Sequence, residues 1–259
     1  MRSGAADAKE TSVDTTSEIT EAVRTHYAGE ALKMASGGSC CGTDCCASTT
    51  ANGYSAEDLA SLGLDPVASL GCGNPTLLAD LRPGERVLDL GSGAGLDVLL
   101  SAKRVSPGGH AYGVDMTDEM LARANENRKR ADVENATFLR GTIEHVPLAA
   151  GSVDVVISNC VINLAADKDA VLREAYRVLR PGGRFAVADM VALEELPAET
   201  KRRLDAWAGC IAGTITVDRY VAGLTAAGFS EIDVDVTREL VIDGVEGRVA
   251  SAYIRATRP

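Results

Sequence analysis

Val87-Leu88-Asp89-Leu90-Gly91-Ser92-Gly93-Ala94-Gly95 is the stretch of this 259-residue chain that decides its fold. A short apolar run ends in an acid and then in glycines spaced two apart, a pattern typical of a buried parallel strand that turns sharply into a helix. The first glycine permits a positive φ, and the next two leave no Cβ to hold a ligand away. The segment Leu96–Arg104 is apolar enough to be that helix. The sequence therefore predicts a strand–turn–helix unit with a ligand at the turn.

A second acid strengthens this prediction. Asp115 ends the run Gly113-Val114-Asp115, twenty residues after Gly95, and an acid there can accept hydrogen bonds from both ribose hydroxyls of a nucleoside. The glycine spacing is G-x-G-x-G rather than the G-x-G-x-x-G of dinucleotide folds, and the chain has no G-x-x-x-x-G-K-[ST] sequence. We therefore expect a nucleoside-containing ligand and exclude a P-loop.

Strands and helices are expected to alternate strictly through the middle of the chain. Strands are expected at 86–90, 110–115, 136–140, 153–158 and 183–190. Helices are expected at 95–104, 117–130 and 167–179, the last ended by Arg180-Pro181-Gly182-Gly183. This pattern predicts an α/β fold with a parallel sheet covered on both faces. After a helix near 217–227, strands at about 231–240 and 248–256 are close enough in sequence to form an antiparallel pair.

The region before the first core strand has helical and loop signals. Ser17–Lys33 has helical periodicity. Its apolar side chains near one face are Ile19, Val23, Tyr27 and Leu32. Gly37–Gly53 is rich in Gly, Ser, Thr and Cys, which predicts a loop. Two short helices follow, one with Ser55 as its N-cap and Asp58 completing a capping box, and one opened by Asn74-Pro75.

Length and composition fit one domain with an arm, which we place at residues 1–60 ahead of a main domain at 61–259. The net charge of −11 argues against a nucleic-acid partner, and the basic stretch Arg123–Arg130 fits the solvated face of a helix. No apolar run reaches the roughly 18–20 residues needed to cross a bilayer, and the N-terminus lacks a secretory h-region. We therefore expect a cytoplasmic protein that binds neither nucleic acid nor membrane.

Three further segments, together with the glycine stretch, resemble the motifs of a known protein family. They are Val114-Asp115-Met116, Gly151-Ser152-Val153-Asp154-Val155-Val156 and Leu179-Arg180-Pro181-Gly182-Gly183. Over about residues 80 to 190, the chain resembles the Rossmann-like S-adenosylmethionine-dependent methyltransferases. The resemblance implies a mostly parallel seven-stranded sheet with an antiparallel C-terminal hairpin, an N-terminal helical arm, and S-adenosylmethionine as cofactor.

The same resemblance implies a cofactor site at the carboxyl ends of the strands, where ligands bind in open α/β sheets. The implied cofactor-binding residues are Asp89, Gly91, Ser92, Gly93, Gly95, Asp115, Met116, Thr142, Ile143, Glu144 and Asn159. The glycines would contact the methionine moiety, Asp89 would hold its amino group, Asp115 would hold the ribose, and Met116 would pack on the adenine. From the residues alone, both acids also fit helix N-caps, and Met116 and Ile143 fit ordinary core positions.

Seven cysteines in a reducing compartment are more often ligands, nucleophiles or core residues than disulfides. Cys160 follows the strand at 153–158 by two residues, which places it at the carboxyl edge of the sheet. Cys72 lies in a glycine-flanked loop, and Cys210 lies in an insertion near 192–216. Each alone fits a small buried hydrophobe, but all three can converge over one cleft. Thiolates are soft ligands that prefer thiophilic centres.

The cysteine motifs sharpen the resemblance. They are Gly71-Cys72-Gly73-Asn74-Pro75, Ser158-Asn159-Cys160-Val161-Ile162-Asn163 and Gly209-Cys210-Ile211-Ala212-Gly213. With Tyr54-Ser55-Ala56-Glu57-Asp58-Leu59, they make the chain similar to the arsenite S-adenosylmethionine methyltransferases over about residues 25 to 220. The resemblance implies that Cys72, Cys160 and Cys210 are catalytic and hold arsenic(III), whose lone pair attacks the sulfonium methyl. It also implies arsenite or arsenic–thiol conjugates as substrate, a thiol reductant (glutathione or thioredoxin), and a monomer.

Some alternatives stay open at this point. Cys40-Cys41 and Cys45-Cys46 fit thiol capture of arsenite, a transient disulfide with Cys72, or a flexible thiol-rich loop with incidental metal affinity. The chain as a whole also fits a methyltransferase with a carbon, oxygen or nitrogen acceptor. A third alternative is a thiol-based metal-binding protein that carries zinc on Cys72, Cys160 and Cys210.

Overall fold

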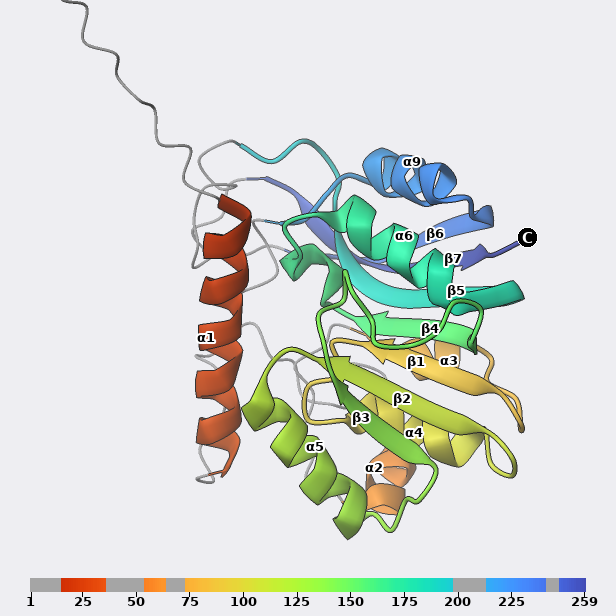
Figure 1. Cartoon of the computed structure of the whole chain (residues 1–259). Helices are drawn as coiled ribbons and strands as arrows, with labels where there is room; N and C mark the ends of the chain where they lie inside the picture. The colour runs from red at the N-terminus through yellow and green to blue at the C-terminus, as the bar shows by residue number, and fades with distance from the viewer. Residues whose placement is uncertain (1–14, 36–53, 64–72, 198–212, 241–246) are drawn as a thin grey trace, which may run out of the picture.

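A computed structural model describes residues 15–35, 54–63, 73–197, 213–240 and 247–259. Its centre is a seven-stranded sheet in the order β3-β2-β1-β4-β5-β7-β6 (Figure 1). The strands are β1 (Arg86–Leu90), β2 (His110–Asp115), β3 (Ala136–Arg140), β4 (Val153–Asn159), β5 (Leu179–Ala192), β6 (Ser230–Leu240) and β7 (Val249–Thr257). The first five run parallel, and β7 pairs antiparallel with both β5 and β6. The predicted fold class and its C-terminal hairpin are confirmed.

Helices cover both faces of this sheet. They are α1 (Thr15–Ala35), α2 (Ala56–Leu62), α3 (Pro75–Leu78), α4 (Leu96–Arg104), α5 (Asp118–Arg130), α6 (Lys168–Val178) and α9 (Val217–Ala227), with a 3₁₀ turn, η2 (Ile162–Leu164). In Figure 1, α6 and α9 lie in front of the sheet, and α2, α3 and α4 lie behind it. Helix α1 stands at the end where the parallel strands finish, beside α5 (Figure 1).

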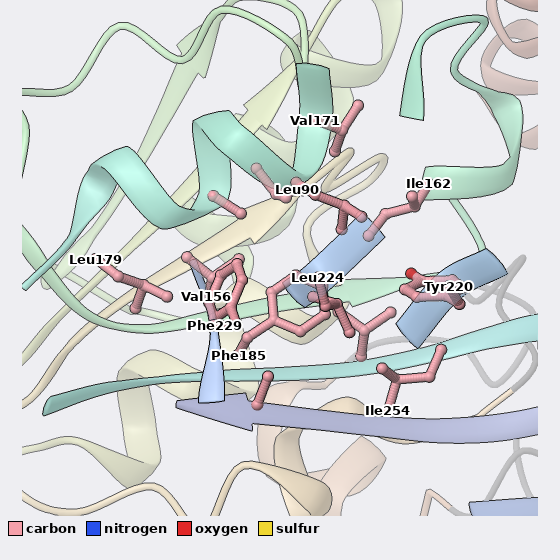
Figure 2. Packing of buried hydrophobic residues seen from close by; sticks show 14 of the residues in the cluster. Leu90, Val156, Ile162, Val171, Leu179, Phe185, Tyr220, Leu224, Phe229 and Ile254 are labelled. Atoms are coloured by element: carbon pink, nitrogen blue, oxygen red, sulfur yellow. The ribbon is translucent and has the colours of Figure 1, made fainter. Parts of the chain in front are cut away.

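Strand β1 shows how the sequence alternation builds the two faces. Leu88 and Leu90 join the large apolar cluster under α6 and α9, while Val87 packs on the opposite face with side chains of α3. Figure 2 shows the first cluster, in which Phe185 and Leu224 lie among the buried side chains. Asp89 shares its face with Val87, so its carboxylate lies on the α4 side of the sheet at the carboxyl end of β1.

Several local predictions are confirmed by the structure. Ser55 accepts a hydrogen bond from the Asp58 N–H and completes a capping box at α2, and Asn74 caps α3 with Pro75 in its first turn. The strand bounds predicted from 86 to 140 are the observed ones.

Two expectations were wrong. The alternation is not strict, because residues 141–152 connect β3 to β4 by turns without a helix. The segment 180–183 does not separate α6 from a later strand: β5 begins at Leu179, and these residues form an irregularity in its pairing with β4. Leu32, one of the four apolar side chains near one face of α1, is 62% exposed. No helix within the described residues is long and apolar enough to cross a membrane.

Candidate active site

A pocket lies at the carboxyl ends of β1, β2 and β4, where open α/β sheets bind ligands. All eleven residues predicted to bind the cofactor line it: Asp89, Gly91, Ser92, Gly93, Gly95, Asp115, Met116, Thr142, Ile143, Glu144 and Asn159. Cys160 lines the same pocket. The sequence therefore identified which segments meet at this edge of the sheet.

The three glycines of the turn do different jobs. All have positive φ, so the turn requires each of them. A Cβ on Gly91 would lie 2.3 Å from a methyl of Val161, and one on Gly95 would lie 2.5 Å from the ring of Phe138. A Cβ on Gly93 would meet nothing closer than the sulfur of Met120, at 4.0 Å. The expectation that both later glycines clear space for a ligand is therefore wrong for Gly95, which makes room for the core, and stays a prediction for Gly93, where a Cβ would meet open space.

Asp115 is anchored by backbone donors at the end of β2. Its carboxylate accepts hydrogen bonds from the N–H of Gly93 at 2.9 Å and from the N–H of Thr117 at 2.8 Å. Burial raises the pKa of Asp115, and these two donors partly offset that rise. Asp115 is not a helix cap, because Thr117 occupies the N-cap position of α5. Each carboxylate oxygen keeps acceptor capacity that two ribose hydroxyls can use.

Asp89 is buried without a donor. It is 3% exposed, and among the residues that the structure describes none donates a hydrogen bond to its carboxylate. Burial, and then the charges of Asp97 and Asp115, raise its pKa well above the ordinary value. A buried carboxylate without a protein partner is costly, and a cationic ligand in the pocket removes that cost. An α-ammonium group has the required charge and donors.

The sequence did not identify Asp97 or its partner Tyr54 as candidate site residues. Asp97 of α4 lines the pocket, where one oxygen accepts a hydrogen bond from the Tyr54 hydroxyl at 2.7 Å and the other from the Asn159 amide at 3.3 Å. Asn159 also donates to the Tyr54 hydroxyl at 3.0 Å and to the Gly73 carbonyl at 2.8 Å. Burial raises the pKa of Asp97 to about 6, against the hydrogen bonds from Tyr54 and Asn159 that lower it.

Cys160 sits in an unusual backbone conformation. Its φ is +59°, which L-residues with a side chain rarely adopt, and its N–H donates to the Ala188 carbonyl at 2.8 Å. The side chain is 5% exposed and packs with Val23 of α1 and Met190 of β5. Cys160 is disulfide-bonded in this structure.

The other predicted sulfur ligands, Cys40, Cys41, Cys45, Cys46, Cys72 and Cys210, lie outside the described residues. Within the described part of the chain, no group of three His, Cys, Asp or Glu side chains could hold a metal ion.

Helix α1 also contributes to the pocket. Thr20, Val23 and Tyr27 line it. The helical periodicity placed Val23 and Tyr27 near one face of the helix, but not what that face covers, because nothing in a helix's own sequence states its tertiary neighbour. The pocket is therefore bounded by both the sheet and the arm.

Comparison with known proteins agrees with this geometry. Residues 81–228 match a family described as a methyltransferase domain. The arsenite methyltransferase of Halobacterium salinarum is 44% identical over 265 residues, which cover 93% of this chain and 67% of that protein. The chain belongs to the arsenite methyltransferase family. A second arsenite methyltransferase, from Aquipseudomonas alcaligenes, is 43% identical over 56% of this chain and 43% of its own length.

The solved structures include a member of the same family. The arsenic(III) S-adenosylmethionine methyltransferase of Chlamydomonas reinhardtii matches with a TM-score of 0.68 and 34% identity, covering 76% of this chain and 72% of that chain. This chain thus spans between two fifths and three quarters of the length of these arsenite methyltransferase relatives.

As a member of the arsenite methyltransferase family, this protein uses S-adenosylmethionine as its cofactor. The pocket fits it on three observations: a glycine cradle open at Gly93, an anchored acid at Asp115, and an unpartnered buried acid at Asp89. When bound, the cofactor supplies an electrophilic methyl group on a sulfonium centre. The roles of the individual lining residues, and the domain division at residue 60, stay predictions.

Proposed function

We propose that this protein methylates trivalent arsenic with S-adenosylmethionine as the methyl donor. The observation that carries the proposal is Cys160, a cysteine that lines the cofactor pocket and follows Asn159, which donates a hydrogen bond to Asp97. A sulfur at that position can hold a thiophilic acceptor next to the methyl group.

The surroundings of Cys160 support a three-cysteine site. The carbonyl of Gly73, the residue after Cys72, accepts a hydrogen bond from Asn159, the residue before Cys160. Residues 213–216, which follow Cys210 closely in sequence, adjoin the end of β5: the Ala192 N–H donates to the Ile215 carbonyl at 2.9 Å. Ala192 and Cys160 belong to one side-chain cluster. The chain therefore approaches this region from all three cysteine motifs, as gathering Cys72, Cys160 and Cys210 on one arsenic requires.

The proposed chemistry needs no general base. Three thiols displace three hydroxides from arsenite as water, leaving arsenic(III) on three sulfurs with a lone pair on the open side. In the proposed step, the arsenic–carbon bond would form from that lone pair as the carbon–sulfur bond of the donor breaks. The positive charge would pass from sulfur to arsenic, which becomes pentavalent, and S-adenosylhomocysteine would be released as a neutral thioether. The role of the protein is mainly to position the reactants, an effect worth up to roughly 7–11 kcal/mol of barrier.

Reduction has to precede this cycle. Cys160 cannot ligate arsenic while it is half of a disulfide, so a thiol reductant such as glutathione or thioredoxin must first convert that disulfide to two thiols. One of Cys40, Cys41, Cys45 and Cys46 would join the thiol exchange during turnover. We place the protein in a reducing compartment, the cytoplasm, and expect it to act as a monomer.

The deciding experiment uses the full chain with arsenite, S-adenosylmethionine and a thiol reductant, and measures methylated arsenic together with S-adenosylhomocysteine. We expect both products in equal amounts during the first methylation. Cys160→Ser is expected to abolish transfer while S-adenosylmethionine affinity stays within about threefold. Arsenite binding without product would favour a metal-binding protein, and neither binding nor product would favour a carbon, oxygen or nitrogen acceptor.

A second set of variants addresses the early cysteines. Replacing Cys40, Cys41, Cys45 and Cys46 by serine together is expected to slow the multi-turnover reaction. Unchanged turnover through every methylation step would end the redox role proposed for them.

A further inference from the structure

The charged residues that line the cofactor pocket are all acidic within the described part of the chain. Four acids line it, Asp89, Asp97, Asp115 and Glu144, and no lysine, arginine or histidine appears among the described lining residues. Asp89 and Asp97 are buried, and Asp115 and Glu144 are partly buried. Such a site favours ligands with positive charge.

The acids are ordered along the pocket. Asp115 is anchored by Gly93 and Thr117 at the end expected to hold the ribose. Asp97 contacts Asn159, whose neighbour in sequence is Cys160. Asp89 lies on β1, which stands in the sheet between β2, the strand of Asp115, and β4, the strand of Asn159. Through its hydrogen bond with Asn159, Asp97 is the acid tied to the β4 side of the pocket, where Cys160 also lies.

The position of Asp97 is fixed by its partners. Tyr54, 1% exposed and packed in the apolar cluster of α2 and α4, donates to one carboxylate oxygen, and Asn159 donates to the other. Arg104 adds a more distant positive charge from the far end of α4. Both donors favour the ionised form of the acid and hold it in one orientation.

The two forms of the cofactor differ in charge at one atom. S-adenosylmethionine has a positive sulfonium, whereas S-adenosylhomocysteine has a neutral thioether, and the ammonium and carboxylate groups are common to both. A carboxylate that faces the ammonium therefore binds the two equally well. Only a carboxylate near the sulfur can separate donor from product.

We propose that Asp97 is a specificity-determining residue that favours the sulfonium of S-adenosylmethionine over the thioether of S-adenosylhomocysteine. Methyl transfer removes the charge that Asp97 attracts, so the spent cofactor is held less tightly than the donor. This selectivity does not depend on which acceptor takes the methyl group, so it stands or falls separately from the arsenite activity.

Binding measurements on the full, reduced chain test this proposal. Calorimetry would compare S-adenosylmethionine, S-adenosylhomocysteine and an aza analogue in which a protonated nitrogen replaces the sulfonium. Asp97→Asn is expected to weaken the two cationic ligands roughly 10- to 50-fold and the thioether less than about threefold. Asp233→Asn, an exposed acid on β6 paired with Arg255, is the matched control for losing one charge and should change none of the three. Equal weakening of all three ligands by Asp97→Asn, or no weakening, overturns the proposal.

A second variant keeps the test decisive if Asp97→Asn does not fold. Tyr54→Phe retains the carboxylate but removes one donor, which raises the pKa of Asp97 further. Wild-type selectivity for the donor over the product should fall as the pH drops through about 6, and in Tyr54→Phe it should fall at a higher pH. An unchanged midpoint in Tyr54→Phe would show that another acid sets the selectivity. Asp89, Asp115 and Glu144 are the other acids that line this pocket.

Discussion

Two buried aspartates in this protein have similar partners but different surroundings. Asp97 is paired with Asn159 and Tyr54, and Asp189 is paired with Asn163 and lies near Tyr220. Both asparagines come from the short segment that follows the body of β4. Asp97 faces the cofactor pocket, whereas Asp189 is 0% exposed and lies on the α6 and α9 side of β5.

Hydrogen bonding separates the two sites further. Both oxygens of Asp97 accept hydrogen bonds from side chains. In Asp189, one oxygen accepts from the Asn163 amide and from the Met190 N–H, each at 2.8 Å, and the other has no partner within the described residues. The Asn163 amide also donates to the Met190 carbonyl at 2.7 Å. Asp189 and Asn163 thus clamp the loop that carries Cys160 to β5, while Asp97 and Asn159 face the ligand. A hydrogen-bonded aspartate–asparagine pair therefore faces the ligand on one side of the sheet and holds the core together on the other.

The pH dependence of stability is expected to show the largest effect. Burial raises the pKa of Asp189 to about 7 and that of Asp97 to about 6, so the folded protein holds these protons more tightly than the unfolded chain. The free energy of unfolding should therefore fall as the pH rises from about 4 towards each of these values. Between about pH 4 and pH 7, Asp189→Asn should make the decline in unfolding free energy roughly 3–4 kcal/mol smaller than in the wild type. Between about pH 4 and pH 6, Asp97→Asn should make it roughly 2–3 kcal/mol smaller.

Urea unfolding at several pH values measures this decline. Saturating S-adenosylmethionine should reduce the pH-dependent decline in unfolding free energy that Asp97 contributes. The decline that Asp189 contributes should stay unchanged. If the cofactor flattened both parts equally, the two sites would not be distinct.

Removing the asparagines separates the two sites at constant pH. Asn163→Ala leaves the buried Asp189 carboxylate and the Met190 carbonyl without that donor, which should cost about 2–3 kcal/mol of unfolding free energy. Methyl transfer should fall with it while S-adenosylmethionine affinity changes little, because Asn163 does not line the pocket. Asn159→Ala, at a half-buried position, removes a donor to Asp97 and should cost about 1–2 kcal/mol while it also weakens cofactor binding. The reverse order of stability losses would contradict the assignment.

The sequence predicted the acids of the cofactor pocket better than it predicted the buried acid of the core. Asp89 and Asp115 were found because each ends an apolar strand, and strand ends share one edge of a parallel sheet. Tyr54 and Asp97 are 43 residues apart, so their hydrogen bond exists only in the folded chain. Asp97 in the first turn of α4 looks like an ordinary complement to the helix dipole. Asp189 had a usable signal that the analysis did not use: an acid inside the apolar strand Phe185–Ala192 must be buried with partners.

The glycine turn also contains one residue that serves the core, Gly95, and one that faces the pocket, Gly93. Gly95→Ala places a Cβ against Phe138 at a φ of +89° and should cost about 2 kcal/mol of stability. Gly93→Ala meets open space and should cost only about 1 kcal/mol, yet weaken S-adenosylmethionine binding at least as much. Thermal melts with and without the cofactor separate the two losses. A cofactor-induced rise in melting temperature that survives in Gly93→Ala would show that the cofactor does not approach this glycine.

The tyrosines give the smallest expected difference. The Tyr220 hydroxyl is buried and has no hydrogen-bond partner among the described residues, so Tyr220→Phe removes an unsatisfied group and should change stability by less than about 1 kcal/mol, in the stabilising direction. Tyr54→Phe removes a donor to a buried carboxylate and should destabilise by about 1–2 kcal/mol above pH 6, where Asp97 is ionised. Paired urea titrations at pH 8 measure both. If Tyr220→Phe were the more damaging change, its hydroxyl would have to serve Asp189 as Tyr54 serves Asp97, and the two sites would be equivalent after all.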